Sequence, residues 1–142
     1  LFHDAVHRGA AAAYTAEQRA AWSPAPPAGA LWHERLAGAH TLVAERGGRP
    51  AGFMSLGGNG RIDLAYVAPG EMGRGTAGAL HDALLEVARA RGLARLTAEA
   101  SRLARPFLAR RGWRVISVQE VLRGGVALEN FLMELPLGGV EA

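Results

Sequence analysis

The stretch that decides the fold is "YVAPGEMGRGTAGALHDALLEVARARG", which runs from Tyr66 to Gly92. It begins like the end of a strand, passes through a glycine-rich turn and continues as a helix. The apolar residues after the turn recur at the spacing of one helix face, at Leu80, Leu84, Val87 and Ala88. We therefore predict a helix over Thr76–Arg91, ended by Gly92, whose N-terminus follows a turn suited to phosphate.

One interpretation of this turn is a dinucleotide site, because Gly73, Gly75 and Gly78 spell G-x-G-x-x-G. Such a site needs a strand that ends at the first glycine and an acidic residue about 20 positions later, and Glu99 lies near that spacing. However, residues 68–72 separate the strand from Gly73, and hairpin patterns flank the unit on both sides. A dinucleotide-binding protein is therefore only a remote alternative.

The bulk composition limits the other possibilities. A chain of 142 residues is the size of one domain, and it contains neither an apolar run long enough to cross a bilayer nor a signal-peptide pattern. The absence of cysteine excludes disulfides and thiolate chemistry and suits a reducing compartment. We therefore expect a cytoplasmic protein of one domain, residues 1–142, with no membrane partner.

The basic residues do not indicate nucleic-acid binding. The net charge is +3, and all 16 basic residues are arginine. They are scattered, and several have an acidic neighbour, as in Glu34-Arg35 and Glu45-Arg46. Nucleic-acid binding would favour a basic stripe with interleaved aromatic residues, whereas a modest positive charge also suits a small anionic ligand.

The order of predicted elements is α/β, with a mixed and mostly antiparallel sheet. Helical stretches occupy the N-terminal part, where Thr15 and Gln18 resemble a capping box, and a short helix follows over Leu31–Ala37. "TLVAERGGRPAGFMSL" and the turn "GGNG" predict three antiparallel strands that end in "RIDLAYV". After the long helix come the strand "LARLTAEA", a helix over Ser101–Arg111 and a final hairpin around Gly124-Gly125.

The motif Val67-Ala68-Pro69, followed by residues 72–77 as "MGRGTA", resembles the acyl-CoA loop of the GNAT (GCN5-related) N-acetyltransferases. That loop has the form Gln/Arg-x-x-Gly-x-Gly/Ala, after a strand that ends Val-x-Pro and before a long helix. The order of elements is similar to that of the family along nearly the whole chain. The segments "LFHDAVH", "ARPFLARRGWRV" and "GVALENFLMEL" resemble a small bacterial branch of this family.

The resemblance implies a GNAT fold and the transfer of an acetyl group from acetyl-CoA, as co-substrate, to a primary amine. It implies direct attack by the amine of a small-molecule or peptide acceptor, in a monomer or homodimer without a metal. A non-catalytic acyl-CoA-binding module or sensor is the alternative. The implied acetyl-CoA contacts are Ala65, Tyr66 and Val67 on the strand and Met72, Gly73, Arg74, Gly75, Thr76 and Ala77 in the loop.

Three departures from the family pattern bear on activity. Met72 stands where the loop usually has Gln or Arg, so a side-chain donor is missing while the backbone is unaffected. Leu108 stands where many members carry a tyrosine that serves as general acid, and leucine has no proton to donate. The resemblance also places the first strand of the family before Leu1, which would leave a sheet edge uncovered.

Three residues are candidates for the chemistry. Strand alternation predicts that Asp63 shares a face with Ala65 and Val67, so that it can act as general base toward a ligand on that face. Glu99, at the end of the next strand, is a second candidate base. Ser101 is a candidate proton donor, although serine before a helix is also a common N-cap.

The N-terminal helices supply the candidates for acceptor binding, because in the resembled fold they border the acceptor site. His7 and Tyr14 are the residues we expect there, with placement on a helix surface as the alternative. His3-Asp4 and His7 form H-D-x-x-H, which differs from the zinc motif H-E-x-x-H and has no evident third ligand. We therefore predict no metal site.

Overall fold

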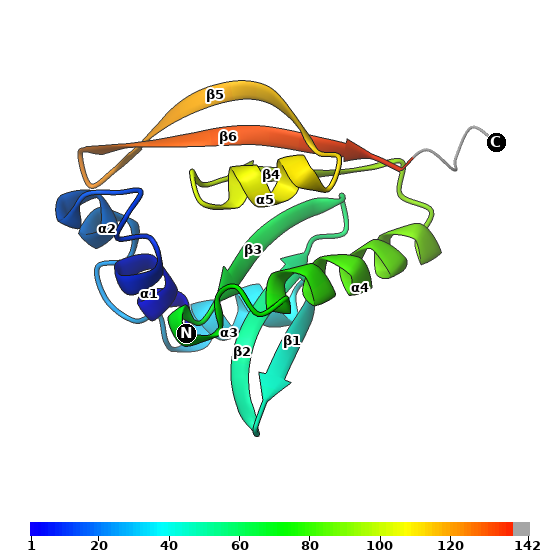
Figure 1. The fold of residues 1–142 in the computed structure, drawn as a ribbon, viewed down its shortest axis with the longest axis horizontal. Coiled ribbons are helices and arrows are strands. Elements are labelled where there is room, and N and C mark those ends of the chain that lie inside the picture. Colours follow the sequence, from blue (N-terminus) through cyan, green and yellow to red (C-terminus); the bar gives the residue numbers. More distant parts are fainter. Residues whose placement is uncertain (138–142) are drawn as a thin grey trace.

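The computed structural model describes residues 1–137 and has one six-stranded sheet with helices on both faces (Figure 1). The last five residues of the predicted domain lie outside the described part. The strands are β1 (His40–Arg46), β2 (Arg49–Leu56), β3 (Arg61–Val67), β4 (Arg95–Ala100), β5 (Arg114–Arg123) and β6 (Val126–Pro136). The helices are α1 (Phe2–Asp4), a π-helical turn (Ala5–Gly9), α2 (Ala16–Trp22), α3 (Ala30–Ala37), a 3-10 turn (Pro69–Glu71), α4 (Thr76–Ala90) and α5 (Ala104–Arg110).

The sheet order is β1-β2-β3-β4-β6-β5, and only the β3–β4 pair is parallel. The prediction of a mixed, mostly antiparallel sheet is therefore confirmed. Gly47-Gly48 joins β1 to β2 and Gly124-Gly125 joins β5 to β6, and all four glycines have positive φ angles. Two consecutive residues with positive φ are the requirement of the tight hairpin turn that matches the twist of antiparallel strands.

Helix α4 makes the crossover from β3 to the parallel strand β4 and covers one face of the sheet. It begins at the predicted residue, Thr76, and ends one residue before the predicted end, at Ala90. Its apolar stripe packs into the main core, where Leu84 is fully buried and contacts the cluster that contains Met54 and Leu96. Burial of this stripe fixes the helix N-terminus relative to the end of β3.

The N-terminal segment and α3 lie on the other face and at one end of the sheet. The predicted capping box is present, because Gln18 N donates to Thr15 Oγ1 and Thr15 N donates to Gln18 Oε1. Gln18 Nε2 also donates to the carbonyl of Ala127 in β6 at 3.0 Å, so α2 is tied to the last hairpin. None of the helices in the described part of the chain is long and apolar enough to cross a membrane.

Helix α5 is shorter than the predicted Ser101–Arg111. Ser101 lies outside it, and its Oγ accepts a hydrogen bond from Ala104 N at 3.1 Å. Pro106 lies in the first turn, where a missing N–H costs no intrahelical bond. Two strands, β1 and β5, form the edges of the sheet built by the described residues.

Candidate active site

The turn before α4 presents a row of free backbone N–H groups. Gly73 and Gly75 have φ angles of 78° and 83°, the left-handed region that glycine adopts without strain. A Cβ added to either residue would meet no atom within 4 Å, so open space lies beside the turn. Within the described part of the chain, the N–H groups of residues 73–78 donate no hydrogen bond. At the N-terminus of a 15-residue helix, such groups form a cradle for an anion.

The side chains of this loop contact other parts of the protein. Met72 packs on the N-terminal segment, since a Cβ added to Gly9 would lie 2.3 Å from the terminal methyl of Met72. Arg74 points away from the core and lies 3.5 Å from a carboxylate oxygen of Glu71. Thr76 is buried against Gly52, and Ala77 packs against the main core. The cradle therefore depends on the backbone of the turn.

Gly78, the third glycine of the G-x-G-x-x-G pattern, has a packing role. A Cβ at this position would lie 2.4 Å from a guanidinium nitrogen of Arg111, which crosses the helix there. Arg111 in turn donates to Asp82 at 2.9 Å and lies over the ring of Phe107. The missing side chain of Gly78 thus makes room for Arg111. In a dinucleotide fold, the third glycine instead allows the helix to pack closely on a strand.

Strands β3 and β4 separate after a short parallel contact and form a wedge. Their register contains only the pairs Arg61↔Thr97 and Ile62↔Ala98, whereas β3 continues to Val67. The edge of β3 beyond Ile62 is thus not paired with β4. Unpaired strand edges offer backbone N–H and C=O groups to an extended ligand.

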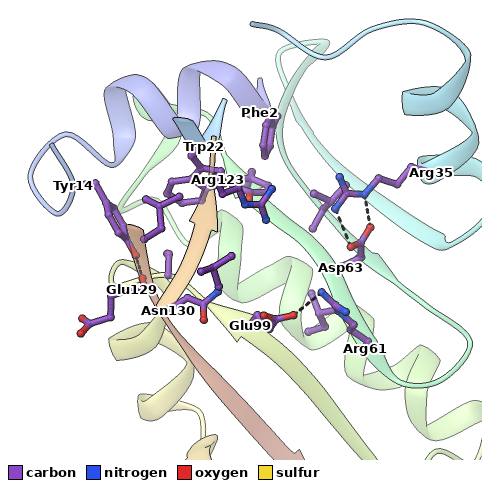
Figure 2. Close-up of a pocket in the computed structure, with 16 residues that line it drawn as sticks. Phe2, Tyr14, Trp22, Arg35, Arg61, Asp63, Glu99, Arg123, Glu129 and Asn130 are labelled. Carbon is purple, nitrogen blue, oxygen red and sulfur yellow. Dashed lines mark hydrogen bonds and ion pairs between the residues drawn. The ribbon is translucent and has the colours of Figure 1, made fainter. Parts of the chain in front are cut away.

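A cavity of about 140 Å³ lies along β3 next to this wedge (Figure 2). Its walls come from the N-terminal segment, α3, β3, β4 and the β5–β6 hairpin. Among the predicted site residues, Tyr14, Asp63, Tyr66, Glu99 and Ser101 line it. The predicted acetyl-CoA contacts Ala65 and Val67 and the loop residues 72–77 do not line it, so β3 bears the cavity on one side and the cradle at its end.

Asp63 does not share a face with Ala65 and Val67, so the alternation argument was wrong. Met54 pairs with Ala65 and lies in the core with α4, whereas Asp63 contacts Arg35 of α3 on the opposite face. The reason is a one-residue register shift between Ser55 and Leu56, which leaves Asp63 as an extra residue in β3. A bulge of this kind reverses the side-chain alternation and redirects one side chain.

The carboxylate of Asp63 is held by the guanidinium of Arg35. Arg35 Nε and a terminal nitrogen donate to the two carboxylate oxygens at 2.7 and 2.9 Å. This hydrogen bonding with Arg35 lowers the pKa of Asp63. Asp63 therefore stays ionised at neutral pH, and its low pKa makes it a poor acceptor of a proton.

Glu99 belongs to a chain of polar contacts that crosses the cavity. Arg61 donates to Glu99 Oε1 at 2.8 Å, and Gln119 Nε2 donates to Glu99 Oε2 at 3.1 Å. The same Gln119 nitrogen donates to Asn130 Oδ1 at 2.9 Å. Glu99 is an exposed residue, so a ligand in the cavity can approach its carboxylate from the solvent side.

Tyr14 and Ser101 line the cavity, and the hydroxyl oxygen of each already accepts a hydrogen bond from a backbone N–H. Tyr14 donates to the carbonyl of Glu129 at 2.8 Å and accepts from Arg102 N at 2.9 Å. Burial raises the pKa of Tyr14, so its phenol is neutral. Ser101 caps α5 as an acceptor, which leaves the hydrogen of its hydroxyl group free to donate.

His7 does not line the cavity, contrary to our expectation. Its ring Nε2 lies 2.6 Å from the carbonyl oxygen of Ser23, and its ring packs on that of His3, with centroids 4.2 Å apart. His3 in turn contacts the hydroxyl of Ser23 at 2.8 Å. Both histidines thus hold the connector after α2 in place, which accounts for their spacing of one helical turn.

Aromatic rings form the apolar wall of the cavity. Tyr66 meets Phe2 edge to face, with centroids 4.5 Å apart, and Trp22 lies 6.2 Å away. Burial raises the pKa of Tyr66 to about 12, so this phenol does not act as a base near neutral pH. Leu108 is buried in the main core at 6% exposure and brings no polar group to the site.

Several cavity residues were missed by sequence reasoning, namely Arg35, Arg61, Arg123, Glu129 and Asn130. Arg35 is 28 positions from its partner Asp63, so no local spacing indicates the pair. For Arg123 the sequence did contain a signal. Strand alternation along β5 places Gln119, Val121 and Arg123 on one face, so these three side chains could have been grouped together.

Comparison with known proteins identifies the family. The model of the acetyltransferase (GNAT) domain matches residues 10–135. The chain therefore belongs to the GNAT acetyltransferase family, and its mostly antiparallel sheet excludes the doubly wound dinucleotide fold.

Individual relatives agree with this assignment. The uncharacterized N-acetyltransferase YafP of Escherichia coli is 32% identical over 133 residues, which cover 94% of this chain and 83% of that protein. A GCN5-related N-acetyltransferase from Rhodopseudomonas palustris superposes with a TM-score of 0.90 at 38% identity, covering 96% of this chain and 85% of that one. YncA of Salmonella typhimurium, solved with its cofactor acetyl-CoA, has the same fold, with a TM-score of 0.64, 22% identity and coverage of 96% and 84%.

Proposed function

We propose that this protein is an acetyl-CoA-dependent N-acetyltransferase that modifies a primary amine by direct attack. The observation that carries the proposal is the combination of the N–H cradle before α4 with the wedge between β3 and β4. The open space beside Gly73 and Gly75 fits a pyrophosphate, because glycine lets the backbone approach and the helix N-terminus favours negative charge. The free edge of β3 suits the pantetheine arm.

When bound, acetyl-CoA supplies a thioester carbonyl, at which the C–N bond forms and the C–S bond breaks. Glu99 is the residue we assign as general base, because it lies in the cavity and Arg61 contacts only one of its carboxylate oxygens, whereas Arg35 holds both oxygens of Asp63. It accepts the proton of the ammonium group directly or through one water. Gln119 and Arg61 hold one carboxylate oxygen each, so they fix the direction of the remaining lone pairs.

Asp63 has a supporting role in this scheme. Its pairing with Arg35 keeps it charged, so it favours the cationic amine near the wedge but accepts a proton less readily than a free carboxylate. Ser101 is the candidate donor to the departing thiolate, since its hydroxyl hydrogen is free and it lines the cavity. The thiol of cysteine has a pKa near 8.5, so protonation of an alkyl thiolate is favourable at neutral pH and needs little assistance.

One observation favours the alternative of a non-catalytic acyl-CoA-binding module. Leu108 occupies the position at which the family resemblance leads one to expect a tyrosine, and it is buried in the core. Such a module binds acetyl-CoA but releases no CoA with any amine.

Turnover measurements with Glu99→Gln separate the two functions. CoA release is followed with a broad amine panel, and Glu120→Gln serves as the matched control because Glu120 is an exposed β5 carboxylate outside the cavity. We expect Glu99→Gln to lower kcat by about a hundredfold or more with unchanged acetyl-CoA affinity, the usual contribution of a general base. Wild-type rates in Glu99→Gln would refute the assignment of the base, and absence of turnover in the wild type would favour the binding module.

A further inference from the structure

Not every charged side chain that lines the cavity has a partner within the lining. Three arginines and three carboxylates line it. Arg35 pairs with Asp63, Arg61 pairs with Glu99, and Glu129 pairs with Arg102, which lies outside the lining. Within the described part of the chain, Arg123 forms no ion pair. The cavity thus has one cation available for a ligand.

Arg123 is placed to use this charge inside the cavity. It is the last residue of β5, before the turn Gly124-Gly125, and it is exposed. It shares a strand face with Val121, which also lines the cavity. Figure 2 shows its guanidinium directed into the space between Trp22 and the Arg35–Asp63 pair.

Asn130, on the neighbouring strand β6, adds a second free donor. Its Oδ1 accepts from Gln119 Nε2 at 2.9 Å, an assignment that leaves its NH₂ group for the cavity. Within the described part of the chain, Nδ2 of Asn130 donates to no other group. Free donors on Arg123 and Asn130 therefore face a cavity in which every carboxylate already has an arginine partner.

The size and wall of the cavity suit a small ligand with an apolar part. At about 140 Å³ it holds roughly ten groups of the size of a water molecule, on the basis of 10–15 Å³ for each. Phe2, Trp22 and Tyr66 give it an aromatic wall. This volume is sufficient for a molecule of amino-acid size.

We propose that the acceptor is a small primary amine that also carries a carboxylate, of the size of a free amino acid. This inference rests on the proposed acetyltransferase function. Arg123 binds the carboxylate, with its guanidinium fork matching the two carboxylate oxygens, Asn130 offers a further donor on the cavity wall, and the amine is directed to Glu99. The aromatic wall contacts the apolar part of the acceptor.

The test uses matched pairs of acceptors that differ only in the carboxylate. The nineteen standard amino acids that carry a primary amine and their carboxamides are compared by CoA release, and binding to the CoA-loaded protein is measured by calorimetry. Arg123→Gln is the test variant, and Arg123→Lys is a second variant that keeps the charge without the fork. Arg49→Gln is the control, because Arg49 is also an exposed strand residue beside a Gly-Gly turn but lies outside the cavity.

We expect at least one amino acid to exceed its carboxamide by about tenfold or more in kcat/KM and in affinity. Arg123→Gln should reduce this ratio to within about threefold, Arg123→Lys should give an intermediate ratio, and Arg49→Gln should leave it unchanged. Acetyl-CoA affinity, measured separately, should be the same in all four proteins.

Equal or better use of carboxamides or polyamines by a protein that binds acetyl-CoA would overturn this inference and leave the proposed function intact. The same conclusion follows if Arg123→Gln retains the full preference, or if phosphoethanolamine is preferred to every carboxylate. Failure to bind acetyl-CoA would refute the proposed function and the inference with it.

Discussion

Replacing Gly75 with alanine tests the cradle before α4. Gly75 has a φ of 83°, where a Cβ costs roughly 1–2 kcal/mol of backbone strain. No protein atom lies within 4 Å of the added Cβ, so the methyl group would enter the space assigned to the pyrophosphate. Gly48 is the matched control, because it has a φ of 77° and equally open surroundings at the tip of the β1–β2 hairpin.

The expected loss of affinity comes from the hydrogen bonds that the turn would donate. A hydrogen bond from a backbone N–H to a charged group contributes about 1.5–3 kcal/mol, so losing one weakens CoA binding by roughly ten- to a hundredfold. Calorimetric titration with CoA should show this change in Gly75→Ala and less than about a twofold change in Gly48→Ala. Both variants should lose similar amounts of thermal stability. Equal CoA affinities in the two variants would refute the placement of the pyrophosphate at this turn.

Two further predictions concern stability. His81 is buried, its Nε2 accepts from Trp113 Nε1 at 2.9 Å, and burial lowers its pKa below 6.5. The unfolded state therefore binds the extra proton first, and the free energy of unfolding should fall below pH 6.5 by up to about 1.4 kcal/mol per pH unit until the folded-state pKa is reached. Urea titrations of the wild type and His81→Gln at several pH values check this. If the free energy of unfolding changes equally with pH in the two proteins, the prediction is wrong. Leu84→Ala, at a fully buried core position, should lower the free energy of unfolding by about 2–5 kcal/mol, and a loss below 1 kcal/mol would show that α4 packs differently.

Local patterns were sufficient to predict most of the fold. The period of the apolar residues after Thr76 predicted α4, and the Gly-Gly pairs predicted both tight hairpins. Each of these patterns involves residues only a few positions apart, so it can be recognised in the sequence without knowledge of the fold. The capping box of Thr15 and Gln18 is a signal of the same kind.

The site depends on features that local patterns do not encode. The extra residue in β3 reverses the face on which Asp63 lies, and nothing in "RIDLAYV" distinguishes a bulged strand from a regular one. The partners of the charged groups come from distant segments, as in Arg35–Asp63 and Gln119–Glu99. His7 was misplaced because the carbonyl of Ser23, 16 residues later, holds its ring away from the cavity.

The central claim is that the cradle and the wedge bind acetyl-CoA, and a thermal-shift titration tests it most directly. Acetyl-CoA at 100 times its Kd should stabilise the protein by about 2.7 kcal/mol, which raises Tm by several degrees for a domain of this size. NAD and NADP, which also carry a pyrophosphate, serve as controls and should produce no comparable shift. A shift with acetyl-CoA alone is the result we predict, whereas no shift with acetyl-CoA, or an equal shift with NAD, would contradict the account.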